Sequence, residues 1–181
     1  MSPSTPILTR LGLAALLALL PVALAAQSIA DFVGTYTGSA ILSTEEGDER
    51  RDMSTTIERT EEAFLVRWTS VAYKDDGRTT EKTYEVDFVP SPRANIFGSA
   101  MKTNVFGKPE ALDPLEGDPF VWARLEGATL SVFSMAINAS GEYELQEYHR
   151  SLAEGGLDLK FLRIRNGTAE REVSAFLARQ D

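Results

Sequence analysis

One short motif in the sequence is typical of a catalytic serine. The stretch SAMK, Ser99 to Lys102, has the Ser-x-x-Lys spacing of penicillin-interacting enzymes, in which a helical turn brings the lysine to the serine. Here the motif lies in strand-like sequence, and residues three apart in a strand point to opposite faces. The Ser-Asp-Asn and Lys-Thr-Gly motifs of those enzymes do not occur in the chain. We therefore expect no serine catalysis at this position.

His149, in the stretch EYHRS, is the only histidine of the chain. A Ser-His-acid triad would have to include it. The Gly-x-Ser-x-Gly turn that exposes the nucleophile of many hydrolases does not occur. We expect His149 to be a strand residue beside Arg150, and we expect the protein not to be an enzyme.

The same composition restricts metal chemistry. With one histidine and no cysteine, the chain lacks the ligands of a zinc site. Calcium prefers carboxylate and carbonyl oxygens, and two acidic groups are conceivable ligands: Asp113, Glu116 and Asp118, or Glu45, Glu46 and Asp48. Neither group has the residue order of an EF-hand loop, so we expect solvated loops and no metal. A carboxylate pair for glycoside hydrolysis depends on a spatial separation, which keeps a carboxylate-based enzyme open as a less favoured alternative.

The N-terminal residues have the pattern of a secretory signal peptide. Arg10 precedes an uncharged apolar run from Leu11 to Ala26, which is shorter than the ~20 residues of a membrane-spanning helix. The run ends in Ala23-Leu24-Ala25, with small residues at the spacing that signal peptidase accepts. We predict a signal peptide over residues 1–25, cleaved after Ala25 or Ala26, and a single domain over residues 26–181 that is periplasmic or secreted.

Charge and cysteine content exclude several partners. The formal net charge is −9 at pH 7, and the lysines and arginines do not cluster in the sequence, so we expect no nucleic-acid partner. The absence of cysteine excludes a lipid-modified N-terminus and any disulfide. We therefore expect no stable membrane anchor after cleavage of the signal peptide, and a fold that depends on its core.

The residues that follow alternate between turn signals and strand-like runs. In KTYEVDFVP, the apolar Tyr84, Val86 and Phe88 alternate with acidic residues, as in a strand that is buried on one face. GLDLKFL repeats this pattern, which then slips by one residue and predicts a bulge. We predict ten strands: 33–42, 51–59, 63–74, 79–89, 95–103, 119–125, 128–137, 142–151, 157–165 and 170–178.

Two segments are less regular than the others. Residues 105–119 contain three prolines and no alternation, and a loop of this length is often functional. Residues 170–178 fit either a short amphipathic helix or a strand, and the alternation of Val173, Ala175 and Leu177 with polar residues favours the strand. No long helical pattern is available for parallel crossovers, so we predict an all-β fold with antiparallel pairing.

The stretch DFVGTYTGSA places Gly34 and Gly38 around Tyr36. It lacks the Lys-Ser/Thr that follows a phosphate-binding loop, and it lies outside any long apolar helix in which paired glycines would pack. Glycines within a strand instead allow a sharp bend or a close backbone approach. A meander of many strands has two free edges unless it closes. The sequence therefore predicts a single up-and-down barrel of about 8–10 strands.

In this stretch the chain resembles the lipocalin-like (calycin) barrels, whose first strand commonly carries Gly-x-Trp after a short helical turn. Tyr36 stands where that family has tryptophan. The resemblance implies a late-strand arginine across the aromatic ring, and Arg163 or Arg165 would take this place. It also implies an alternative role for His149, because some ten-stranded members hold haem through one histidine. We expect no cofactor.

Aromatic side chains on the predicted strands are either core residues or the lining of a pocket. A barrel of this size is filled by side chains or holds one small ligand. We predict a ligand pocket formed by Tyr36, Trp68, Tyr84, Phe88, Trp122 and Arg124. Arg67 and Arg124 either face inward as partners of an anion or outward into water.

These observations favour an exported, non-catalytic barrel that binds a small apolar or amphipathic ligand. The first alternative is a protein-interaction or structural module of the cell envelope, which would use its outer surface or residues 105–119. The sequence identifies neither the ligand nor a protein partner.

Overall fold

The computed structural model describes residues 27–44, 47–74, 76–103, 108–110 and 112–180, and these residues are nearly all in strands. The predicted signal peptide lies outside this part of the chain, as do Glu45 and Glu46. A four-residue helix, α1 (Ile29–Phe32), precedes the first strand. No helix in the described ranges is long and apolar enough to cross a membrane.

The long strands form one closed antiparallel barrel, in the order β1-β12-β11-β10-β9-β8-β5-β4-β3-β2. Their bounds are β1 Gly34–Thr44, β2 Gly47–Arg59, β3 Phe64–Tyr73, β4 Thr79–Pro90, β5 Ile96–Ser99, β8 Phe120–Glu126, β9 Thr129–Ile137, β10 Tyr143–Ala153, β11 Gly156–Arg165 and β12 Thr168–Gln180. Each strand pairs with its neighbour in the chain, and β12 returns to β1. The all-β, up-and-down barrel predicted from the sequence is thus confirmed.

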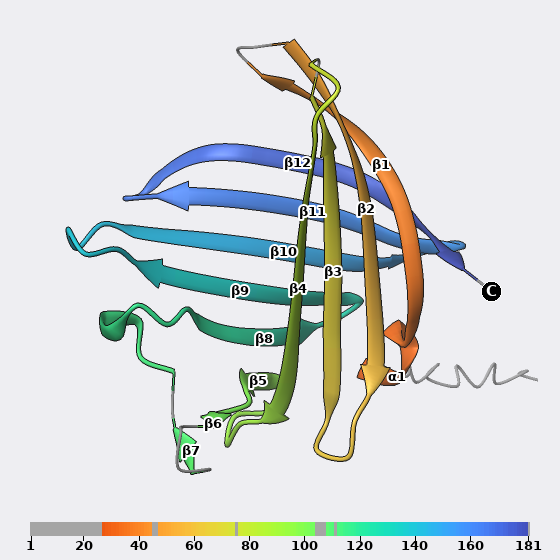
Figure 1. Ribbon diagram of the computed structural model, residues 1–181. Helices are drawn as coiled ribbons and strands as arrows, with labels where there is room; N and C mark the ends of the chain where they lie inside the picture. Colours follow the sequence, from red (N-terminus) through yellow and green to blue (C-terminus); the bar gives the residue numbers. More distant parts are fainter. Residues whose placement is uncertain (1–26, 45–46, 75, 104–107, 111, 181) are drawn as a thin grey trace, which may run out of the picture.

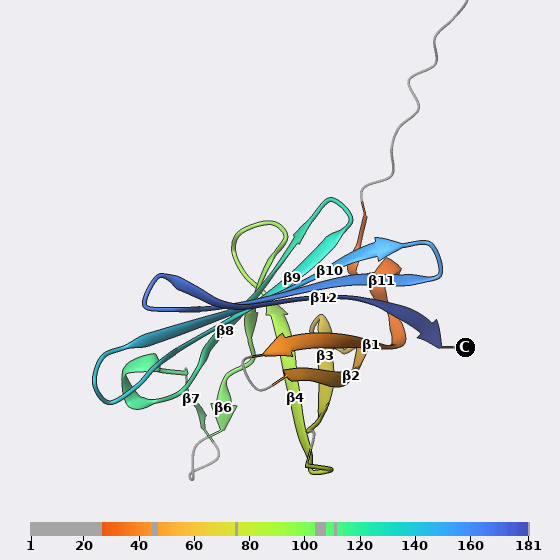
Figure 2. The same ribbon diagram turned by 90° about the horizontal axis from the view of Figure 1, so that it is seen from above.

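The barrel is flattened, and its two walls cross. Strands β1–β4 run across β8–β12 rather than alongside them (Figure 1, Figure 2). Only the short β5 links β4 to β8 on one side, with three residue pairs to each neighbour. On the other side, β12 pairs with β1 over three residues.

Two local predictions have different outcomes. The strand over 170–178 is confirmed, because β12 runs through it without a helix. The single strand over 95–103 is wrong beyond Ser99: the Ala100 N–H still donates to the Asp87 carbonyl oxygen, and the chain then leaves the barrel. It forms β6 (Lys102–Thr103), which pairs with β7 (Pro109–Glu110) outside the barrel, and a 3₁₀ turn, η1 (Pro114–Glu116), follows.

The predicted bulge is present, but it does not cause the slip in the apolar pattern. The register between β11 and β12 shifts between Arg163 and Ile164. Phe161, Arg163 and Arg165 nevertheless continue the inward face of β11, because all three line a cavity inside the barrel. The pattern slips because the barrel interior changes along β11 from packed apolar side chains to polar ones.

One end of the barrel is filled by a packed apolar core. Its completely buried residues include Phe32 of α1, Ile57, Phe64 and Phe88. Phe64 stacks on Phe88 with ring centroids 5.0 Å apart, and it meets Phe97 edge-on at 4.9 Å. α1 lies at this end of the barrel (Figure 1), and its Phe32 belongs to the same core cluster as these rings.

Tyr36 lies at this closed end, where the barrel closes between β1 and β12. It links α1 to both of these strands. Its hydroxyl donates to the Phe32 carbonyl oxygen over 2.9 Å. The guanidinium of Arg179, from β12, lies 5.5 Å from the ring centre and donates to the Tyr36 hydroxyl and the Val33 carbonyl oxygen. The arginine across this ring is therefore Arg179, and the placement of Arg163 or Arg165 there is wrong.

Two glycines allow other strands to pack closely on β12: Gly38 of β1 and Gly156 of β11. A Cβ atom on Gly38 would lie 2.2 Å from the Phe176 carbonyl oxygen, and one on Gly156 would lie 2.1 Å from the Leu177 carbonyl oxygen. Both oxygens belong to the backbone of β12, so neither can move without parting the strands. Gly38 thus serves the close backbone approach that its place in the strand predicted.

We expect Gly38→Ala to lower the free energy of unfolding by about 1–3 kcal/mol, because the added methyl group overpacks the contact between β1 and β12. Urea unfolding followed by circular dichroism measures this change. Gly98→Ala in β5 is the matched control, since a Cβ there meets no atom within 4 Å. Equal stability of the two variants would contradict the role of Gly38 in closing the barrel.

Candidate functional site

The other half of the barrel interior holds a cavity of about 640 Å³, which we call the interior cavity. Side chains from β2, β3, β4, β10, β11 and β12 line it. These strands alternate inward and outward residues, so β10 contributes Glu144, Gln146, Tyr148 and Arg150 from one face. The volume is in the range of small-molecule sites in proteins, about 300–1,000 Å³.

A row of aromatic rings crosses the barrel between the packed core and the interior cavity. Trp68 of β3 stacks on Tyr84 of β4 at 5.3 Å, and it contacts Tyr148 of β10, on the opposite wall, at 5.1 Å. Tyr148 in turn contacts Phe161 of β11 at 4.9 Å. The four rings line the interior cavity and offer apolar surface to a bound molecule.

Arg150 is a completely buried cation at this row of rings. Its guanidinium carbon lies 5.5 Å from the ring centres of both Trp68 and Tyr148. Its Nε donates to the Thr55 hydroxyl over 3.4 Å, whereas Nη1 and Nη2 have no hydrogen-bond partner among the described residues. Burial lowers the pKa of Arg150 to about 10, because the charged form loses its hydration.

The lining of the interior cavity is strongly basic although the chain as a whole is acidic. Seven lining residues are lysine or arginine, and only Glu49 and Glu144 are acidic. Arg171 forms no ion pair within the described part of the chain. Its pKa is lowered first by burial and then by the charges of Arg163 and Arg51. The cavity therefore concentrates positive potential within a protein whose formal net charge is −9.

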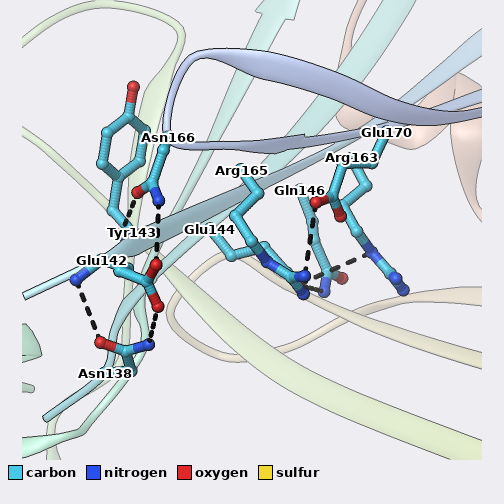
Figure 3. A network of polar contacts seen from close by, with 9 residues as sticks. All are labelled: Asn138, Glu142, Tyr143, Glu144, Gln146, Arg163, Arg165, Asn166 and Glu170. Carbon is cyan, nitrogen blue, oxygen red and sulfur yellow. Dashed lines mark hydrogen bonds and ion pairs between the residues drawn. The ribbon is translucent and has the colours of Figure 1, made fainter. Parts of the chain in front are cut away.

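The two acidic lining residues are already held by arginines. Glu49 binds the guanidinium of Arg51, and Glu144 receives Arg165 Nη2 at 2.8 Å and lies 3.7 Å from Arg163 Nε (Figure 3). Burial acts to raise the pKa of Glu144, but hydrogen bonds from Gln146 and Arg165 bring it below its usual range. Both acidic side chains thus hold arginines of the lining in place, and the hydrogen bonds to Glu144 favour its carboxylate form.

The predicted pocket residues fall into three places. Trp68 and Tyr84 line the interior cavity. Tyr36 and Phe88 lie in the packed core. Trp122 and Arg124 lie on the outer face of β8, where Trp122 stacks on Phe133 at 5.0 Å and Arg124 pairs with Glu126 at 2.7 Å. The structure thus brings together only Trp68 and Tyr84 of the six.

Sequence reasoning missed the arginines of the cavity lining: Arg51, Arg150, Arg163, Arg165 and Arg171. One signal in the sequence could have found Arg150. Tyr148 and Arg150 are two residues apart in β10, so their side chains point to the same face of the strand. Arg67 lies on the outer face of β3, where it pairs with Glu85.

His149 lies on the outer face of β10 between two polar partners. Its Nδ1 bonds with the Ser131 hydroxyl over 2.8 Å, and its Nε2 bonds with Glu147 over 2.9 Å. This is the order of a serine-histidine-acid relay, but Ser131 is only 3% exposed, so a substrate cannot reach its oxygen. His149 also does not line the interior cavity.

The SAMK motif and the acidic residues near Asp118 form ion pairs and hydrogen bonds with each other. Lys102 of the SAMK motif binds the carboxylate of Asp118. Asp118 also accepts the backbone N–H of Asp113 at 3.2 Å. Among the residues that the structure describes, no three histidine, cysteine, aspartate or glutamate side chains gather as a metal-binding group.

The fold and the interior together define a closed, ten-stranded, antiparallel barrel with one packed end and one hollow, basic end. A scan against protein-family models gave no match to the chain, and neither did a search of curated proteins.

Proposed function

We propose that the protein is an exported, non-catalytic barrel that binds one small amphipathic ligand in the interior cavity. The observation that carries this proposal is the cavity of about 640 Å³ bounded by the row of rings from Tyr84 to Phe161. These rings contact one another across the barrel and form an apolar surface at the end of the cavity next to the packed core. Polar side chains line the remainder of the cavity. Such a combination suits a ligand with an apolar body and a polar group.

The lining favours binding over chemistry. Within the described residues, it contains no histidine or cysteine, and its two carboxylates are paired with arginines. A general acid or base needs a pKa near the working pH, whereas hydrogen bonds hold the pKa of Glu144 low. We therefore assign the cavity to ligand binding.

The resemblance to lipocalin-like barrels is part of the same proposal. It is supported by the up-and-down closure and by Tyr36, the aromatic residue of the first strand, which lies under Arg179 of the last strand. Export is supported by the uncharged apolar run from Leu11 to Ala26.

Mass spectrometry of the mature protein should find a chain that begins at Ala26 or Gln27. A chain that retains Leu11 would contradict export by signal cleavage.

The binding proposal can be tested with tryptophan as an internal reporter. Trp122→Phe leaves Trp68, at the cavity, as the sole tryptophan. We expect energy transfer from Trp68 to a bound naphthalene dye, either N-phenyl-1-naphthylamine or its sulfonated relative 8-anilinonaphthalene-1-sulfonate, at one dye per chain. Trp68→Phe, which keeps Trp122 on the outer face, is the comparison: direct excitation of the dye measures whether binding is retained, and transfer from Trp122 should be weaker than transfer from Trp68. Absence of saturable binding by both dyes would contradict the proposed function.

A further inference from the structure

We infer that the ligand is an amphipathic organic anion and that Arg150 binds its acidic group. This inference rests on the proposed function, because it names the chemical class of the molecule held in the interior cavity. The acidic group can be a carboxylate, a phosphate or a sulfonate, since each presents two or more oxygens to the paired nitrogens of a guanidinium.

The first support is that the guanidinium of Arg150 lacks hydrogen-bond partners for two of its nitrogens. Its side chain is 0% exposed, and the groups around it are the Thr55 hydroxyl and the rings of Trp68 and Tyr148. No carboxylate of the described residues reaches it, and both of its Nη atoms are without a hydrogen-bond partner there. Proteins rarely bury a charge without a partner, because no other interaction then compensates for the lost hydration free energy. An anion entering the cavity would supply the missing acceptors.

The second support is the arrangement of charge along the cavity. Arg51, Arg163 and Arg171 lie close enough to one another that the first two lower the pKa of the third. Arg171, like Arg150, has no ion pair in the described part of the chain, whereas the arginines on the outer faces of β3 and β8 do. The lining thus carries seven basic side chains against two acidic ones, and this excess of positive charge attracts an anion into the barrel and repels a cation.

The third support is the position of the apolar surface. The rings of Trp68 and Tyr148 lie against Arg150 itself. The acidic group therefore binds beside the row of rings, and the organic body of the ligand contacts those rings and the neighbouring Phe161. A free inorganic anion would leave this apolar surface uncovered, so the site selects an acid that carries an apolar group.

The two dyes test this inference because they differ only by a sulfonate group. In the Trp122→Phe background, we expect the sulfonated dye to bind at least tenfold more tightly than the neutral dye. Arg150→Met should remove this difference by weakening the sulfonated dye alone. Arg67→Met is the matched control, since Arg67 lies on the outer face of β3, away from the cavity, and pairs with Glu85. Titration with 1-naphthoate and 1-naphthyl phosphate then distinguishes a carboxylate from a phosphate preference.

The outcomes separate the two claims. Equal affinity for the neutral and sulfonated dyes, in the protein and in Arg150→Met, would overturn the inference and leave the proposed function in place. Equal weakening of the sulfonated dye by Arg67→Met and Arg150→Met would also overturn it, because general charge would then explain binding. Failure of both dyes to bind would overturn the proposed function and the inference together. Circular dichroism of Arg150→Met confirms that the barrel is folded in each comparison.

Discussion

Replacing Arg150 with methionine is expected to raise the free energy of unfolding of the ligand-free protein by about 1–4 kcal/mol. The arginine is completely buried, and its Nη atoms have no partner among the described residues. Methionine has a similar length, lies well against aromatic rings and carries no charge to desolvate. Urea unfolding of the two proteins measures the difference. The same substitution is expected to weaken binding of the sulfonated dye at least tenfold, so stability and binding move in opposite directions.

The control for this prediction is Arg67→Met, which changes an exposed ion pair on the outer face of β3 and should alter stability by less than about 1 kcal/mol. Destabilisation by Arg150→Met would contradict the argument, because it would show that the guanidinium stabilises the ligand-free barrel. A residue that weakens the fold but is required for binding is typical of a functional site.

The pH dependence of this stability difference has a defined sign. The pKa of Arg150 is about 10 in the folded protein, below its ordinary value, so the unfolded chain holds the proton more strongly. Stability therefore rises with pH through this group as the pH passes above about 10, and the burial of the charge is fully unfavourable below that pH. We expect the advantage of Arg150→Met over the unchanged protein to shrink above pH 10. An advantage that grows there would contradict the assignment.

The sequence predicts the barrel well because strand signals are local. Alternation in β4 and turn residues at regular intervals locate ten strands, and their antiparallel order follows from short connections. The end of β5 was missed because Ser99 to Thr103 keeps a strand-like composition after the chain has left the barrel. Departure from a sheet depends on the neighbouring strands, which a local pattern does not contain.

The site was harder to predict, because the type of an inward-facing residue does not tell whether it lies in the packed end or in the hollow end of the barrel. Phe88 and Trp68 share the inward face, yet Phe88 lies in the packed core and Trp68 at the cavity. In β8, the smaller Val121, Ala123 and Leu125 point inward and the larger Trp122 points outward, so the size of a side chain misleads. The basic residues of β11 interrupt an apolar pattern, and the interruption marks where the interior becomes a cavity.

Replacing Phe64 with alanine is expected to lower the free energy of unfolding by about 3–5 kcal/mol, the largest loss that we predict for a single substitution. Phe64 is completely buried in the closed end and contacts both Phe88 and Phe97. Phe120→Ala is the matched control, because Phe120 is 46% exposed on the outer face of β8 and its loss should change stability by less than about 1 kcal/mol. Urea unfolding measures both.

Binding should survive this loss of stability. Phe64 does not line the interior cavity, and the row of rings through Trp68 lies between the two halves of the barrel. At a temperature where Phe64→Ala is folded, we expect its affinity for the sulfonated dye to stay within about twofold of the unchanged protein, since distant sites act nearly independently. Loss of dye binding in a folded Phe64→Ala protein would show that the packed end sets the shape of the cavity. The opposite effects of Phe64→Ala and Arg150→Met follow from a difference between the two halves of the barrel. Apolar packing at one end stabilises the fold, whereas the hollow end buries a guanidinium whose Nη atoms have no hydrogen-bond partner among the described residues.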